Sequence, residues 1–306
     1  MVKIALDPTP YHSTHELLDF FDVAAAAGYD WLQLTPHPDL SPFFTHPRAD
    51  ADLLRRLRKR SADSGVGISS LLPVQRWSWP EENLRVAAVR NLKRVLQIAA
   101  DLDVAVINTE FSGRPERAEE SEAGFLRSVE ELLPTIRSTG VRINIDPHPD
   151  DFVEDGLDAW RLIRGLDDPA FGFCYVASHT FHYGDRATTL LPELGDRLGA
   201  VYTADTFDHH RSHGLRYISN PPGNTARVHQ HLRIGAGDVD WTELFTTLAA
   251  TGFLAREDAI VCSNVFAEDE TADETSRYQL DAIRRLIEEA GRTPSDPAAT
   301  AGGDGR

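Results

Sequence analysis

The chain has 306 residues, of which 41% are hydrophobic, and a formal net charge of -17. This acidity argues against a nucleic-acid backbone or an anionic membrane surface as a partner, and no apolar run approaches the roughly 18 residues of a membrane-spanning helix. The two cysteines, Cys174 and Cys262, lie inside apolar runs and form no Cys-x-x-Cys pair. We therefore expect a cytoplasmic protein with reduced core cysteines and without a zinc ribbon.

Short apolar runs alternate with amphipathic segments along almost the whole chain. The runs predict eight strands, at residues 2–6, 31–34, 67–72, 104–109, 141–145, 172–177, 200–204 and 259–263. The other segments predict helices at residues 14–27, 50–64, 82–102, 122–138, 156–165, 186–194, 240–251 and 274–290. Thr14, followed by His15, Glu16 and Leu17, resembles a capped start of the first helix. An unbroken alternation with eight strands favours a closed (β/α)8 TIM barrel over a doubly wound sheet.

No linker divides the chain, so we expect one catalytic domain over residues 1–291. The segment 207–237 is long for a connection and contains Asn220-Pro221-Pro222-Gly223, which predicts a structured loop. Long loops at the carboxyl ends of barrel strands usually carry function. Residues 292–306 are rich in Pro, Ala, Gly and Asp without periodicity, which predicts a disordered tail.

Polar side chains follow four consecutive predicted strands. Glu110 ends the fourth strand, Asp146 and His148 follow the fifth, His179 follows the sixth and Asp205 follows the seventh. Parallel barrel strands end on a single rim, where the active site of such a barrel lies. Scattered surface polarity would not produce this distribution, so we expect these side chains to form one site.

Histidines are concentrated in the second half of the chain. Eight of the twelve lie between His148 and His231, and His229 and His231 point the same way if their backbone is extended. We expect a divalent metal ion bound by Asp146, His179, His229 and His231, because imidazole and carboxylate suit such ions. The alternative is a hydrogen-bonded polar network without a metal.

One residue near this set is a candidate catalytic base or acid. His148 lies on the same face of its strand end as the expected acidic ligand, and an imidazole titrates near working pH. Glu110 and Asp205 are second candidates for the base. Alternatively, Glu110 forms an ion pair with Arg114 or Arg142, and Asp205 caps a helix.

Aromatic residues near the rim fit a sugar-like or aromatic ligand. Trp77-Ser78-Trp79 follows the third predicted strand and Phe43-Phe44 follows the second. Aromatic faces stack on the apolar surfaces of sugars or aglycones, and we expect Trp77 to bind substrate. The alternative is a local hydrophobic cap over the barrel. In the long loop, Arg216 and Tyr217 are expected to close over the substrate or to meet a partner.

Two motifs resemble those of the xylose isomerase-like barrels, which include sugar (phosphate) isomerases, epimerases and abasic-site endonucleases. Ser178-His179-Thr-Phe-His-Tyr-Gly184 is similar to their strand-six Asp-x-x-His motif. His229-Gln-His231-Leu-Arg-Ile-Gly-Ala-Gly237 is similar to their late Asp-x-His…Ile-Gly-x-Gly motif. The resemblance covers most of residues 1–290. It implies that His179, His229 and His231 stand at metal-ligand positions and that Asp146 is the strand-five acidic ligand.

The chain departs from that family at four strand ends. The strand-five acid, usually Glu, is the shorter Asp146, and Val176 replaces the strand-six acid. Tyr202 occupies the strand-seven histidine position, and strand eight ends in Ser263-Asn264 instead of an acid. The resemblance therefore implies a metal held by a different, histidine-rich set.

Four segments resemble one subgroup of this family, the alpha subunit of the C-glycoside deglycosidases. They are Asn108-Thr-Glu-Phe-Ser-Gly-Arg-Pro-Glu116, Asp146-Pro-His-Pro-Asp-Asp-Phe152, Gly214-Leu-Arg-Tyr-Ile-Ser-Asn-Pro-Pro-Gly223 and the His-Gln-His motif. The resemblance implies cleavage of the C–C bond between a 3-keto sugar and an aromatic aglycone. It also implies a divalent ion, Mn²⁺ first and Mg²⁺, Co²⁺ or Zn²⁺ as alternatives, and a small beta subunit as partner.

Three other functions compete with the deglycosidase. A sugar (phosphate) isomerase or epimerase would share the first step, removal of a proton next to a sugar carbonyl. A non-catalytic sugar-binding barrel is favoured by the missing isomerase ligands and disfavoured by the clustered histidines. An endonuclease is disfavoured by the charge of -17 and by the lack of a basic stripe.

Overall fold

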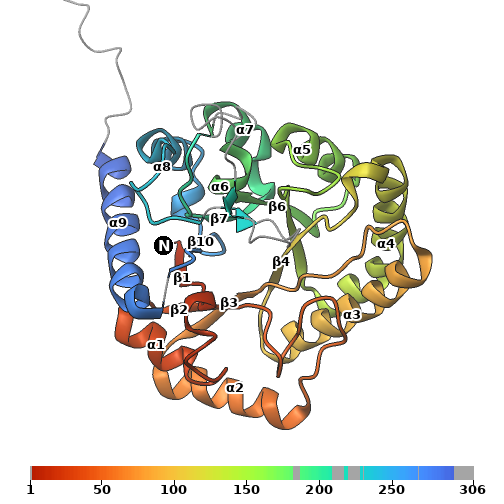
Figure 1. Ribbon diagram of the computed structural model, residues 1–306, viewed down its shortest axis with the longest axis horizontal. Helices are drawn as coiled ribbons and strands as arrows, with labels where there is room; N and C mark the ends of the chain where they lie inside the picture. Colours follow the sequence, from red (N-terminus) through yellow and green to blue (C-terminus); the bar gives the residue numbers. More distant parts are fainter. Residues whose placement is uncertain are drawn as a thin grey trace, which may run out of the picture.

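The eight predicted strands close into a parallel barrel in the order β1-β10-β7-β6-β5-β4-β3-β2 (Figure 1). The computed structural model describes residues 2–181, 187–208, 217–219, 228–229, 231–267 and 269–292, with 217–219, 228–229 and 269 as backbone only. The barrel strands are β1 (Lys3–Leu6), β2 (Trp31–Leu34), β3 (Gly67–Leu71), β4 (Val106–Glu110), β5 (Arg142–Asp146), β6 (Phe171–Val176), β7 (Leu198–Tyr202) and β10 (Ile260–Ser263). The predicted fold class is confirmed.

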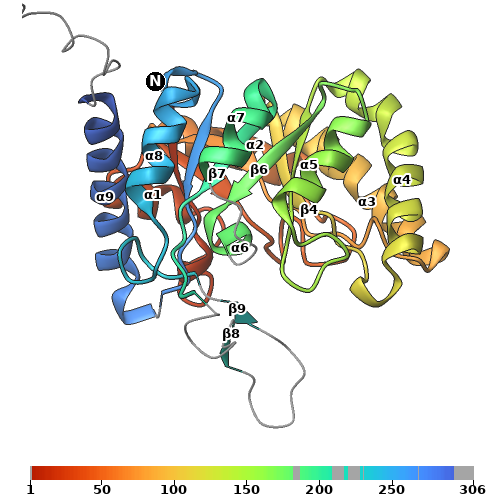
Figure 2. The same ribbon diagram turned by 90° about the horizontal axis from the view of Figure 1, so that it is seen from above.

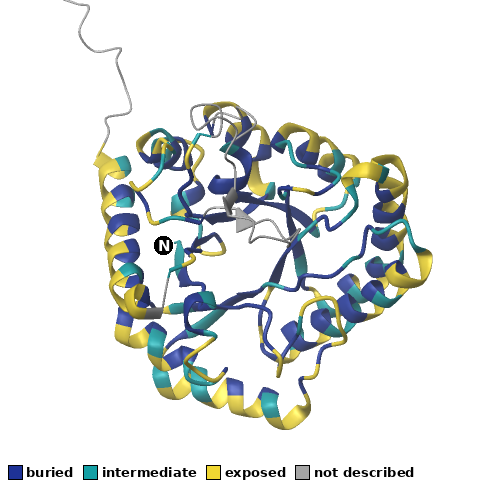
Figure 3. Ribbon diagram, viewed as in Figure 1, coloured by how far each residue is buried: buried dark blue, intermediate teal, exposed yellow. Residues whose placement is uncertain are grey.

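Helices surround the barrel and bury its outer side. They are α1 (Phe20–Ala27), α2 (Ala51–Ser64), α3 (Glu82–Asp101), α4 (Ala118–Thr139), α5 (Gly156–Gly165), α7 (Ala187–Leu194), α8 (Trp241–Ala250) and α9 (Ala272–Arg292), with the short α6 (Ala177–Thr180) directly after β6. Their inner sides are buried and their outer sides exposed (Figure 3). Each amphipathic stripe thus packs on the strands.

The two ends of the barrel differ. An antiparallel pair, β8 (Tyr217–Ser219) and β9 (Val228–His229), belongs to the long segment after β7. Figure 2 shows this pair and α6 on the face opposite the N-terminus and the end of α9. The strands therefore run toward the face that carries α6 and the β8–β9 pair. Within the described residues, no helix combines the length and the apolar character needed to cross a membrane.

The first helix begins later than predicted. α1 starts at Phe20, and Thr14 lies in a series of turns after a short 3₁₀ helix at Thr9–Tyr11. The Thr14 hydroxyl bonds backward to the Tyr11 carbonyl at 3.3 Å instead of accepting from amides ahead of it. A Ser or Thr side chain that bonds to local backbone in this way stabilises a turn and not a helix start. The expected capped start at Thr14 is therefore wrong.

A polar layer fills part of the barrel interior. The Gln33 Oε1 atom accepts hydrogen bonds from Ser70 Oγ at 2.9 Å, from Asn108 Nδ2 at 3.1 Å and from the Tyr202 hydroxyl. Asn144 Nδ2 donates to Asn108 Oδ1 at 2.9 Å. Buried amides are costly unless they are paired, so this network fixes the orientation of each member.

Two glycines make room for one of these amides. Gly172 on β6 and Gly199 on β7 lie against the side chain of Asn144, and a Cβ atom at either position would come within 3.0 Å of it. Real Cβ contacts are essentially never that short, so the strand residues here must lack side chains.

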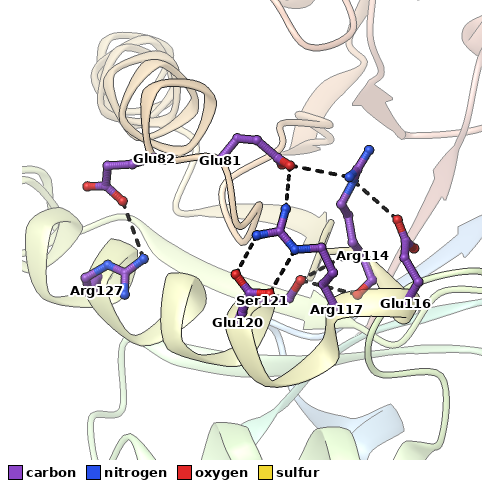
Figure 4. Close-up of polar contacts among 8 residues, drawn as sticks. All are labelled: Glu81, Glu82, Arg114, Glu116, Arg117, Glu120, Ser121 and Arg127. Carbon is purple, nitrogen blue, oxygen red and sulfur yellow. Dashed lines mark hydrogen bonds and ion pairs between the residues drawn. The ribbon is translucent and has the colours of Figure 1, made fainter.

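Ion pairs tie the helices together outside the barrel. The Arg85 side chain is 1% exposed and links Glu82 on α3 to Glu131 on α4, at 2.6 Å to each. Glu81 accepts from Arg117 at 2.6 Å and from Arg114 at 3.4 Å, as Figure 4 shows. The segment that follows β4 is thereby attached to the start of α3.

Candidate active site

A cavity of about 240 Å³ lies at the carboxyl ends of the barrel strands. Larger hollows of about 430 and 480 Å³ lie elsewhere, but no histidine lines them. The polar residues that line the strand-end cavity are Asp7, Thr9, Glu110, Asp146, His148, His179, Tyr202, His231 and Asn264. Strands far apart in the sequence thus bring three imidazoles and three carboxyl groups to one place.

Two buried imidazoles face each other in this cavity. His179 Nε2 and His231 Nε2 are 3.2 Å apart, and the two residues are 5% and 3% exposed. His179 Nδ1 contacts Asp146 Oδ2 at 3.1 Å. His231 Nδ1 lies 2.9 Å from the Asn264 carbonyl, and the His231 ring stacks on Phe266 at 4.2 Å between centroids. Each ring is therefore held through its Nδ1 atom, and the two Nε2 atoms face each other.

The hydrogen-bond chemistry of this chain requires a proton or a cation. The Asn264 carbonyl only accepts, so His231 Nδ1 carries the proton and its Nε2 presents a lone pair to His179. If His179 Nε2 donates to that lone pair, then His179 Nδ1 is unprotonated and Asp146 must carry a proton. If Asp146 is ionised and accepts from His179 Nδ1, two lone pairs face each other across 3.2 Å. A cation between the rings would satisfy both.

Burial favours neutral groups here. Burial first, and then the charges of Glu110 and Asp151, raise the pKa of Asp146 well above its usual value. Burial lowers the pKa of His231 to about 4, against the hydrogen bond to the Asn264 carbonyl. Burial thus favours the uncharged forms of Asp146 and His231.

The two facing imidazole nitrogens provide part of a metal-binding site. Metal-binding imidazoles usually donate their other N–H to a carboxylate or a backbone carbonyl, as His179 and His231 can do here. Among the described residues no three acidic, histidine or cysteine side chains are grouped closely enough to hold an ion alone. The expected third imidazole, His229, has a side chain outside the described residues. Asp146 contacts His179 Nδ1, so it orients that ring.

His148 and Glu110 form a second pair in the same cavity. His148 Nδ1 lies 2.8 Å from the Pro149 carbonyl, which only accepts, so the Nε2 atom of the neutral ring is unprotonated. That Nε2 lies 3.6 Å from Glu110 Oε1, and both side chains are 23% exposed. This pair can take up and hold a proton at the cavity wall. Glu110 does not form the expected alternative ion pair, because Arg114 contacts Glu81 and Arg142 contacts Asp258.

Asp205, predicted as a second candidate base, does not reach the cavity. It is fully buried, and its carboxylate accepts from the amides of Gly235 and Val239 and from Trp241 Nε1. Asp240, not Asp205, caps α8. Asp205 therefore anchors the chain where it returns to the barrel after the long loop, and its proposed catalytic role and its alternative as a helix cap are both wrong.

Trp77, predicted to bind substrate, is also enclosed. Its ring is 0% exposed, packs against Phe125 at 5.1 Å and donates from Nε1 to the Glu110 carbonyl at 2.9 Å. Trp77 thus belongs to the core against α4 and does not line the cavity. Phe43 lines the cavity instead, and Trp79 is half-buried nearby. The sequence pattern alone could not show which of these two tryptophans is enclosed and which is half-buried, because they are only two residues apart.

Three predicted residues lie wholly or partly outside the described residues. Arg216 is not described, and Tyr217 and His229 are described as backbone only. Their expected contacts with substrate, partner or metal stay predictions.

Asp7, which the sequence did not single out, belongs to the cavity. It directly follows β1, and its Oδ2 atom accepts from Asn264 Nδ2 at 2.5 Å and from Gln33 Nε2 at 3.5 Å. Its Oδ1 atom accepts from the amide and hydroxyl of Thr9. The expectation that polar residues at strand ends form the site would also have identified Asp7, if it had been applied to the first predicted strand.

Residues 21–290 match the family of the xylose isomerase-like TIM barrel, and the chain belongs to this family. Among curated proteins no match is found. A solved structure of L-ribulose 3-epimerase is similar with a TM-score of 0.73 and 16% identity, covering 95% of this chain and 96% of that one.

Two further solved structures are similar to this chain. The apo form of 3-keto-D-glucoside 4-epimerase, YcjR, from E. coli has a TM-score of 0.70 and 16% identity, covering 93% of this chain and 100% of that one. The IOLI protein with a bound zinc atom has a TM-score of 0.68 and 15% identity, covering 94% and 99%. At these identities the likeness shows a shared fold, and function rests on the site.

Proposed function

We propose that this chain is a metal-dependent enzyme that removes a proton next to the carbonyl of a keto-sugar and cleaves a 3-keto-C-glycoside. The observation that carries this proposal is a pair of opposed imidazoles, His179 and His231, in one cavity with the His148–Glu110 pair. Enolisation requires a base that accepts the proton and, next to it, a cation that stabilises the developing negative charge.

The metal would be held by His179 and His231, with His229 as the expected third imidazole. When bound, a divalent ion would stabilise the negative charge that develops on the substrate carbonyl oxygen. Asp146 and the Asn264 carbonyl hold the two rings in place. The similar IOLI protein binds a zinc atom, which supports a divalent ion as cofactor here, and Mn²⁺ is our first candidate.

His148 is the proposed base. Its Nδ1–H is held by the Pro149 carbonyl, which keeps the lone pair on Nε2 at the cavity wall. As Nε2 takes the proton from the carbon next to the carbonyl, Glu110 stabilises the imidazolium that forms, since its Oε1 lies 3.6 Å away. Asp7, whose carboxylate only accepts, is placed to bind substrate hydroxyls on another wall of the cavity.

The enolate can then react in two ways. In the cleavage, the electron pair of the broken C–H bond forms a C=C bond, the C–C bond to the aglycone breaks, and a general acid protonates the released carbon. In an epimerisation, a proton returns to the sugar. The resemblance of four sequence segments to C-glycoside deglycosidases favours cleavage, with a small beta subunit as the expected partner. The similarity to a 3-keto-D-glucoside 4-epimerase favours the second reaction.

Deuterium exchange tests the shared step, and product analysis separates the two reactions. The protein, loaded with Mn²⁺, is incubated in D₂O with 3-keto-glucose and with a phenolic 3-keto-C-glucoside. We expect deuterium in the sugar and release of the free phenol. Epimer without phenol would replace cleavage by epimerisation, and binding without exchange would indicate a non-catalytic sugar-binding barrel.

A further inference from the structure

A buried carboxylate joins the loops that follow β4 and β5. Asp151, at the end of the turn after β5, is 5% exposed. Its Oδ1 atom accepts from the amides of Gly113 at 2.6 Å and Phe152 at 2.7 Å, and its Oδ2 atom accepts from the amide of Ser112. Amides that are shielded from water need acceptors, so this one side chain satisfies three of them from two loops.

The backbone that this carboxylate contacts has an unusual conformation. Ser112 has a φ of 55°, and Asp150, which directly precedes Asp151, has a φ of 66°. Such conformations are costly for residues other than glycine and persist only where the surrounding contacts hold them. Asp151 provides these contacts for Ser112, because it accepts from the Ser112 amide and from the next amide along the chain. The course of the loop after β4 therefore depends on this carboxylate.

The same two loops carry the proposed acid–base pair. The Ser112 hydroxyl donates to Glu110 Oε2 at 3.4 Å, and the Asp151 amide donates to the His148 carbonyl at 3.1 Å. In the part of the chain that the structure describes, the Glu110 carboxylate has no other hydrogen bond, and its one ion pair is with His148. The direction of Glu110 therefore depends on Ser112, and the position of His148 depends on the turn that Asp151 closes.

Asp151 lies behind this pair and does not line the strand-end cavity. Apolar packing joins the two loops as well. The Phe152 ring packs on Phe111 at 5.6 Å between centroids, and a Cβ atom at Gly113 would overlap the Phe152 ring. A change in the carboxylate alone leaves these contacts in place, so the loops can stay folded while their relative position changes.

We infer that Asp151 is a positioning residue for the Glu110–His148 pair. Its carboxylate fixes the loops after β4 and β5 relative to each other. Through Ser112 and the turn that begins at His148, it thereby fixes the distance between Glu110 Oε1 and His148 Nε2. This inference rests on the proposed function and adds to it a residue that the proton transfer needs and that lies outside the cavity.

The test compares kcat and KM for deuterium exchange, with 3-keto-glucose and the phenolic 3-keto-C-glucoside as substrates. Asp151→Asn keeps the shape of the side chain but replaces one acceptor oxygen by a donor, so at least one amide loses its partner. We expect kcat to fall by about tenfold, because a small displacement of a catalytic group slows the reaction, while KM changes by less than about twofold.

A control variant separates this effect from lost stability. Asp155 caps α5 through the amide of Asp158, so Asp155→Ala removes a hydrogen bond from a carboxylate to the backbone in the same segment. It should lower the melting temperature and leave kcat unchanged. An equal loss of kcat in Asp155→Ala and Asp151→Asn would show that Asp151 only stabilises the fold.

Ser112→Ala tests the route by which Asp151 acts. It removes the hydroxyl that donates to Glu110, so we expect kcat to fall by about threefold at a nearly unchanged melting temperature. With both substitutions the loss should not exceed that of Asp151→Asn alone, because both affect the same contact. Additive losses, or an unchanged kcat in Asp151→Asn, would overturn the positioning role and leave the proposed function standing. No exchange by the wild type with either substrate would overturn both.

Discussion

Individual side chains of this protein have roles that depend on which atoms their neighbours offer. His148 and His231 are both imidazoles at the same rim, and each has its Nδ1 against a backbone carbonyl. His148 turns its Nε2 to a carboxylate, whereas His231 turns its Nε2 to another imidazole. The first arrangement suits proton transfer and the second suits a cation.

Replacing the proposed base should abolish turnover and leave the cation site intact. We expect His148→Gln to lower the rate of deuterium exchange by about 100-fold or more, because a positioned base contributes at least that much. Metal content, measured by mass spectrometry, should remain that of the wild type. His15→Gln, at an exposed histidine, is the control. Full exchange activity in His148→Gln would rule out His148 as the base.

Asp205 gives a prediction on stability. Asp205→Asn turns one acceptor of a fully buried group into a donor that faces the amides of Gly235 and Val239 and the Trp241 ring. We expect the free energy of unfolding to fall by about 2–3 kcal/mol, since a buried donor or acceptor is left unsatisfied. Urea denaturation measures it, with exposed Asp101→Asn as control. An unchanged midpoint would show that Asp205 does not anchor this segment.

At the scale of the elements, close packing and ion pairs between strands hold the barrel together. β6 and β7 approach Asn144 of β5 so closely that each contributes a glycine there. At the amino ends of the strands, Arg142 at the start of β5 contacts Asp258, just before β10. Both features tie strands that are far apart in the sequence.

Adding a methyl group on β7 should destabilise the barrel. In Gly199→Ala the new Cβ would overlap the Asn144 amide, and we expect a loss of about 1–3 kcal/mol, as for other overpacked cores. Gly165→Ala is the matched control, because no atom lies within 4 Å of that position. Chemical denaturation of the two variants provides the comparison. Equal stabilities would mean that Asn144 moves away without cost.

The Asp258 ion pairs should make stability depend on pH. Hydrogen bonds from Arg256 and then from Arg142 lower the pKa of Asp258 to about 2, below its unfolded value near 4. The ion pairs therefore stabilise the fold above about pH 4, and this contribution is lost as pH falls toward 2. Asp258→Asn should lower the melting temperature at pH 7 by a small amount that shrinks in acid. If the difference in melting temperature between the wild type and Asp258→Asn did not change with pH, the ion pairs of Asp258 would not be its cause.

At the scale of the whole molecule, the proposed cation site would couple metal binding to folding, because its proposed ligands come from separate segments. His179 follows β6, and His231 lies in the long segment after β7. The ring nitrogens of His179 and His231 face each other only in the folded chain, so an ion that binds both of them stabilises the folded state.

Metal addition should therefore raise the melting temperature. With free Mn²⁺ about 100-fold above its Kd, the gain is about 2.7 kcal/mol, or roughly 5 °C for a chain of this size. His231→Ala should show no such shift, and a chelator should reverse it in the wild type. A shift of equal size in His231→Ala would place the ion elsewhere. No shift with any divalent ion would favour the metal-free hydrogen-bonded network.

The sequence by itself determined the barrel and the rim that carries the site. Apolar periodicity is local, so it predicted all eight strands, with their ends shifted by one or two residues. The rule that parallel strands end on one face then placed Glu110, Asp146, His148 and His179 around one cavity, as observed.

Only the tertiary structure decided what each of these groups contacts. Burial depends on residues that are distant in the sequence, and it encloses Trp77 and makes Asp205 an anchor. The facing of His179 and His231 and the inclusion of Asp7 likewise arise from packing across strands. The sequence could not show these, because side-chain direction at a strand end depends on the surrounding loops, not on local pattern.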